Sequence, residues 1–321
     1  MIRAPAKILV LVLVLTGALV ASAVLAQRPV ASASGPGARP SRIIRIEDGG
    51  TVDEANVRTA RETVSHSTVT PAWTNSPGFE QDVFTFARLV FASDPGQRPG
   101  RGFGPRLGWW VDYPDADLNL SWRLQQLTSI RTDPDARVLR LEDSDLHDYP
   151  LLYLEHGGYM RLSDEEVLRL RAYLASGGVL FVNDFWSERE WQGFAAQMER
   201  VLPGRPWVDL PMEHPVFHFI YDLRGPMHRW RVPTMQLWRE DFDPEDPASE
   251  PHRVDRGEGS EVMSVRALRN EAGHIQILAV HNSDLSDAWE REGESDFYFD
   301  RFSERTAYPL GINIVAYLML H

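Results

Sequence analysis

The stretch that decides the fold is Pro150–Trp186, PLLYLEHGGYMRLSDEEVLRLRAYLASGGVLFVNDFW. Leu151–Leu154 and Val179–Val182 are short apolar runs without helical spacing, which is typical of strands buried on both faces. Between them lies an amphipathic segment that begins with a capping box at Ser163 and ends at two consecutive glycines. Strand, helix and strand in this order form a βαβ unit. The unit predicts an α/β fold with a mostly parallel sheet.

Polar residues follow both strands of this unit, at the edge where open α/β sheets bind their ligands. Three residues are candidates for catalysis, with an imidazole as general base and a carboxylate that orients it: His156, Asp184 and His214. Others are candidates for ligand binding: Gly157, Gly158, Asn183, Trp186, His281, Asn282 and Asp284. The alternative is that these polar side chains only cap the turns at the strand ends.

The sequence assigns no metal ligands and no cofactor. Histidine and aspartate are present in sufficient number for a metal site, but no pair has a diagnostic spacing such as HExxH. Two aspartate groups lack the residue order of a calcium loop, and we expect them to be solvated loop carboxylates: Asp112, Asp115 and Asp117, and Asp143, Asp145 and Asp148.

The N-terminal sequence predicts that the protein is exported. Arg3 and Lys7 precede an apolar run, residues 8–26, that ends in a small-residue cleavage pattern, so residues 1–26 are interpreted as a signal peptide or an uncleaved membrane anchor. The rest of the chain divides into a flexible linker, an N-terminal extension and one α/β domain, at residues 27–42, 43–78 and 79–321. We expect a periplasmic or envelope-associated location.

Composition restricts the chemistry and the partners. The chain has no cysteine, which excludes disulfides, thiolate ligands and a cysteine nucleophile. Its net charge of −13 argues against nucleic acid as a partner, and membrane contact is expected only through residues 8–26, if this segment is not cleaved. Ten tryptophans are many for this length, and one or two of them are candidates for stacking on a sugar ring, the others being core residues.

Several segments resemble a bacterial family, domain of unknown function 4159. They are FTFARLVF (84–91), LLYLEHGGY (151–159), LRAYLASGGVLFVNDFW (170–186), EHPVFHFIY (213–221) and LGINIVAYLML (310–320). More distantly, the chain is similar to the class I glutamine amidotransferase-like superfamily, especially its trehalose-utilisation branch. That resemblance implies a flavodoxin-like three-layer sandwich. Amidotransferases of this class use a cysteine nucleophile, so the cysteine-free chain is not expected to share their activity.

Two hypotheses of function follow. The first is an exported envelope protein with a ligand-binding or assembly role, whose ligand is a small molecule or a carbohydrate. The alternative is a hydrolase or isomerase, metal-free or metal-dependent, that acts on a carbohydrate-like substrate. The second hypothesis requires an imidazole and a carboxylate within hydrogen-bond reach of each other.

Overall fold

The computed structural model describes residues 42–46, 50–78, 82–93 and 108–321. The predicted signal segment and nearly all of the predicted linker lie outside these residues. Among the described residues, no helix has both the length and the hydropathy needed to cross a membrane.

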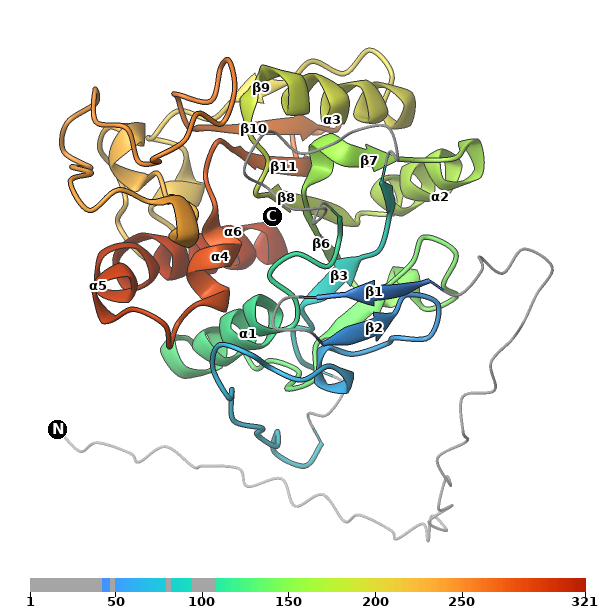
Figure 1. Cartoon of the computed structure of the whole chain (residues 1–321). Helices are drawn as coiled ribbons and strands as arrows, with labels where there is room; N and C mark the ends of the chain where they lie inside the picture. Colours follow the sequence, from blue (N-terminus) through green and yellow to red (C-terminus); the bar gives the residue numbers. More distant parts are fainter. Residues whose placement is uncertain (1–41, 47–49, 79–81, 94–107) are drawn as a thin grey trace, which may run out of the picture. The chain divides into compact units, whose positions relative to one another are not determined.

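A seven-stranded, mostly parallel sheet forms the centre of the fold (Figure 1). Its order is β5-β3-β6-β8-β11-β10-β9, in which only β10 runs against its neighbours. The strands are β3 (Ala87–Leu89), β5 (Arg137–Leu139), β6 (Leu151–Glu155), β8 (Val179–Asn183), β9 (Val208–Asp209), β10 (Ser264–Arg269) and β11 (Ile275–His281). Two smaller antiparallel pairs join β1 (Ile43–Arg45) to β2 (Thr51–Asp53) and β4 (Ala92–Ser93) to β7 (Met160–Arg161).

The helices form two groups. One group contains α2 (Asp164–Ala175) and α3 (Ser187–Val201), and the other contains α1 (Asp115–Leu127), α4 (Leu285–Glu290) and α6 (Tyr308–Leu320). Figure 1 shows the groups on opposite sides of the sheet. This follows from right-handed crossovers, because α1 connects β3 to β5 in one direction and α2 connects β6 to β8 in the other. A short α5 (Asp296–Tyr298) and a π-helix (Phe299–Ala307) precede α6.

The βαβ unit has the predicted form. Leu151 pairs with Val179 in parallel register, and both strands are buried along their whole length. The capping box is present: the Ser163 hydroxyl accepts a hydrogen bond from the Glu166 amide, and the Glu166 carboxylate accepts one from the Ser163 amide. Gly177 ends the helix with φ of 103°. These local interactions explain why the sequence alone was sufficient to predict this unit.

Candidate functional site

The strand order reverses between β3 and β6, which is the point where open α/β sheets form a crevice at their carboxyl edge. At this edge β6, β8 and β11 are each followed by a residue in the left-handed region. These residues are His156, Asp184 and Asn282, with φ of 51°, 48° and 60°. The conformation is unfavourable for residues other than glycine, so tertiary contacts must hold these three turns.

His156 and Asp184 form a buried ion pair at this edge. His156 Nε2 lies 2.7 Å from Asp184 Oδ2, and the Trp186 indole N–H donates to Asp184 Oδ1 at 2.7 Å. Burial by itself would lower the pKa of His156, but the nearby Asp184 carboxylate raises it overall. Burial would likewise raise the pKa of Asp184, yet His156 brings it down to about 2. Each group thus favours the charged form of the other, and among the described residues His156 Nδ1 is buried without a hydrogen-bond partner.

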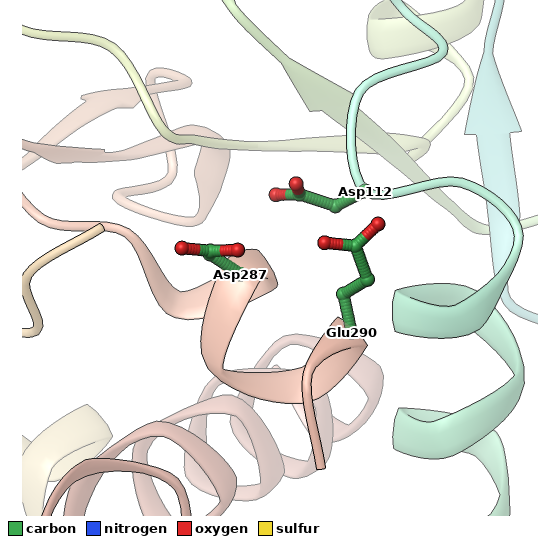
Figure 2. A group of neighbouring side chains, drawn as sticks. All are labelled: Asp112, Asp287 and Glu290. Atoms are coloured by element: carbon green, nitrogen blue, oxygen red, sulfur yellow. The ribbon is translucent and has the colours of Figure 1, made fainter. Parts of the chain in front are cut away.

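Further carboxylates surround Asp112, which is only 6% exposed. One oxygen atom each from Asp112, Asp184 and Asp284 lie within 4.8 Å of one another, and so do one oxygen atom each from Asp112, Asp287 and Glu290. Figure 2 shows the second set, with Asp112 on the loop before α1 facing two side chains of α4. We call these five residues the carboxylate cluster. Asp112 belongs to both sets and lies at their junction.

Basic side chains lie beside Asp287 and Glu290, at one end of the carboxylate cluster. Arg291 Nε lies 2.9 Å from Asp287 Oδ1 and 2.9 Å from Glu290 Oε2. His66 Nε2 lies 2.8 Å from Glu290 Oε1. Burial and the neighbouring carboxylates nevertheless raise the pKa values of Asp287 and Glu290 well above their usual range.

Asp112 and Asp284, at the other end of the carboxylate cluster, have fewer charged side chains beside them. Asp284 accepts hydrogen bonds from the Thr234 hydroxyl at 2.6 Å and from the Asp287 amide at 3.0 Å, all from neutral groups. Among the described residues, Asp112 Oδ2 is buried without a hydrogen-bond donor. In the part of the chain that the structure describes, no ion pair involves Asp112 or Asp284, and the nearby Arg256, 3.9 Å from Asp184 Oδ1, only partly offsets the charge of Asp284.

The pKa values follow from this arrangement. Burial, together with the charge of Asp184, raises the pKa of Asp284 to about 8. Burial, together with Glu155 and Glu290, raises the pKa of Asp112 well above its usual range. Buried carboxylates in such surroundings either take up protons or share a cation.

The donor set suits a hard cation. All ligand atoms would be carboxylate oxygens, which Mg²⁺, Ca²⁺ and Mn²⁺ prefer. Two oxygens on opposite sides of such an ion lie about 4–5 Å apart, given bonds of roughly 2.0–2.6 Å. The separations within 4.8 Å around Asp112 are compatible with this spacing.

A comparison with known families confirms the family that the sequence segments resemble. Residues 102–319 match the model of the domain of unknown function DUF4159. The chain belongs to this family. No curated protein matches at a significant level.

Several sequence-predicted residues of this DUF4159 chain hold the strand-end turns together. The Asn282 side chain accepts from the Ser187 amide and donates to the carbonyls of Gly259 and Val262. Asn183 donates to the Ser286 hydroxyl, and His281 Nε2 lies 3.0 Å from the Ser187 carbonyl. Burial lowers the pKa of His281 to about 4, so this imidazole is neutral.

The two glycines after β6 are needed for close packing. The left-handed residue of this turn is His156, not a glycine. A Cβ atom on Gly158 would lie 2.5 Å from Glu190 Cβ, and one on Gly157 would lie 2.9 Å from Phe194 Cδ2. The glycines therefore let the turn lie directly against α3.

His214 lies away from the other candidates. Its Nε2 is 3.0 Å from an Arg269 guanidinium nitrogen, and Arg269 pairs with Ile275 at the start of β11. His156 and Asn282 lie at the opposite, carboxyl edge of the sheet. Burial and Arg269 lower the pKa of His214 to about 4. The structure does not bring His214 to the carboxylate cluster.

The sequence analysis did not identify three members of the carboxylate cluster as candidate site residues: Asp112, Asp287 and Glu290. The interpretation of Asp112, Asp115 and Asp117 as solvated is wrong, since all three are buried. Asp287 and Glu290 were not considered. A usable pattern was present: with Asp284 they recur every three residues, which places carboxylates on one face of a short helix.

Proposed function

We propose that this DUF4159 chain is an exported envelope protein that binds a divalent cation at the carboxylate cluster and, through the cation, a small-molecule ligand. The observation that carries the proposal is Asp112, whose buried Oδ2 has no hydrogen-bond donor among the described residues and which offers an oxygen within 4.8 Å of each of two carboxylate pairs. A cation between them would neutralise the charge that the surrounding side chains leave uncompensated. Its remaining coordination positions could bind oxygen atoms of a ligand.

Cation binding is tested by titrating the chelator-treated full chain with Mg²⁺, Ca²⁺ and Mn²⁺ while following thermal unfolding and calorimetric heats. At least one cation should raise the Tm saturably, because binding to the native state adds to its stability. Asp112→Asn should weaken that response at least tenfold. Asp148→Asn, which changes an exposed aspartate of the loop before β6, is the matched control and should leave it unchanged. The absence of any saturable response would refute the proposal.

Export rests on the N-terminal sequence alone. Fractionation of producing cells, with N-terminal sequencing of the product, would test it. Recovery of the full-length chain in the cytosol would contradict this part of the proposal without affecting cation binding.

A hydrolase or isomerase acting on a carbohydrate-like substrate is the second candidate, and the 2.7 Å contact of His156 with Asp184 favours it. Asp184 would orient the imidazolium through Nε2, so that the Nδ1–H group could donate a proton to a substrate oxygen as a general acid. His156→Gln should then abolish turnover in a screen of chromogenic glycosides and retain cation binding. If no substrate in the screen is turned over, the binding function stands alone.

A further inference from the structure

A second site candidate lies outside the carboxylate cluster. A cavity of about 850 Å³ opens between the segment 221–245 and the helical stretch 297–309, and no member of the carboxylate cluster lines it. Its volume is within the range of about 300–1,000 Å³ that is usual for small-molecule sites. The cavity is therefore large enough for a ligand of a few rings.

The lining combines aromatic rings with charged groups and contains little aliphatic surface. Tyr221, Trp230 and Phe297 supply the rings, while four carboxylates and three guanidinium groups supply most of the rest. Leu223 is its one branched aliphatic side chain. This composition differs from the predominantly apolar lining of pockets that bind hydrophobic ligands. It offers flat apolar faces next to many donors and acceptors.

Phe297 is a fixed ring at the surface. It is 51% exposed, yet Trp238 stacks on it with ring centroids 5.3 Å apart and planes inclined by 21°. The Arg301 guanidinium carbon also lies 5.7 Å from the Phe297 ring centre. A ring that is already held in place loses little conformational entropy when a ligand stacks on it.

The wall of the cavity includes an unusual helix. The π-helix Phe299–Ala307 contributes Asp300, Arg301, Arg305 and Thr306 to the lining. π-helical segments are rare, and they occur frequently at functional sites. Asp300 and Arg305 are exposed side chains of this helix, which leaves one acceptor and one donor available to a ligand.

We infer that this cavity binds a neutral glycan. The apolar C–H face of a pyranose ring can stack on Phe297 or Trp230, and its hydroxyl groups can donate to Asp243 or Asp300 and accept from Arg305. Four carboxylates against three arginines disfavour a polyanion such as a nucleotide, as does the net charge of −13. The scarcity of aliphatic side chains disfavours a purely hydrophobic ligand. This inference does not depend on cation binding.

The experiment titrates the full chain with maltose, cellobiose and diacetylchitobiose, followed by calorimetry and tryptophan fluorescence. A disulfated disaccharide serves as the anionic comparison. We expect saturable binding of at least one neutral disaccharide. Phe297→Ala and Asp300→Ala should each weaken it about tenfold, which is the effect of losing one stacking contact or one charged hydrogen bond.

Matched controls separate this site from the rest of the chain. Phe219→Ala and Asp296→Ala change a phenylalanine and an aspartate that do not line the cavity, and they should leave affinity unchanged. Asp112→Asn should also leave glycan affinity unchanged, so failure here and failure of cation binding are distinguishable. The inference is overturned if no neutral disaccharide binds saturably, if the anionic sugar binds more tightly, or if Phe297→Ala and Asp300→Ala bind like the parent chain.

Discussion

Two groups of buried carboxylates occupy the carboxyl edge of the same sheet, and they are neutralised differently. Asp117 and Glu155 share the fully buried Arg88, whose Nε lies 2.9 Å from both Asp117 oxygens and whose NH1 lies 2.7 Å from Glu155 Oε2. Arg88 NH1 also donates to the carbonyls of Trp109 and Val111. We call Arg88, Asp117 and Glu155 the Arg88 group. All its polar atoms have partners from the chain itself.

Among the residues that the structure describes, no arginine pairs with Asp112 as Arg88 does with Asp117 and Glu155. A buried charge with a built-in counterion is part of the scaffold, whereas a buried charge without one needs a proton or a ligand. The Arg88 group also holds the segment that ends at Asp112, through the carbonyls of Trp109 and Val111. The comparison therefore separates a structural ion group from the candidate site that it positions.

The largest expected effect comes from breaking the Arg88 group. Arg88→Met leaves two carboxylates buried without their counterion, and we expect it to reduce the free energy of unfolding by about 3–5 kcal/mol. Urea unfolding measures the loss. Arg169→Met, which removes an exposed i, i+4 pair with Glu165, should change stability by less than about 0.5 kcal/mol. Equal midpoints for Arg88→Met and the parent chain would mean that the group is not a stabilising element.

An intermediate effect of opposite sign is expected at Asp112. In the presence of a chelator at pH 8, Asp112→Asn should increase the free energy of unfolding by about 1–3 kcal/mol, because it removes a carboxylate whose ionisation burial opposes. Denaturant unfolding with and without chelator measures it. A variant less stable than the parent under chelator would show that Asp112 contributes structure rather than excess charge.

The smallest expected effect is a pH dependence of the cation-free protein. The pKa of Asp284 is about 8 in the folded protein, above its ordinary value of 3.8. Between pH 3.8 and pH 8 this group therefore binds a proton more strongly in the folded state than in the unfolded state. Stability from this group is complete below pH 3.8 and decreases as pH rises toward 8, by at most about 1.4 kcal/mol per pH unit. The Tm under chelator should therefore fall between pH 6.5 and 8, and Asp284→Asn should reduce that slope.

The Tm is compared only above pH 6.5, because below that pH the protonation of His281 changes stability with the opposite sign to Asp284. His281 has a folded pKa of about 4, below the ordinary 6.5, so its contribution is lost as pH falls below 6.5. His156, whose pKa is raised, loses its contribution as pH increases and adds to the slope of Asp284. An unchanged slope in Asp284→Asn would assign the effect to the other groups whose pKa is raised, among them His156, Asp112 and Asp287.

Much of the fold was predictable because its signals are local. The capping box at Ser163, the glycines after α2 and the two apolar strands lie within one segment, and the parallel pairing of β6 with β8 is confirmed. His156, Asp184 and Asn282 follow their strands at the carboxyl edge of the sheet, whereas the candidate His214 lies elsewhere. The alternative that such residues hold turns applies to Asn282 and His281, but the sequence could not show which partners they have, since these are distant in sequence.

The sequence by itself determined an α/β chain with a parallel βαβ unit and polar strand ends, because strand burial, helix capping and glycine turns depend on neighbouring residues. Only the tertiary structure decided which carboxylates are buried together. Asp112 precedes α1 and Asp287 lies on α4, far along the chain, and the two meet because both helices pack on the same side of the sheet. Burial and charge at such a junction depend on the folded arrangement, and no local pattern encodes them.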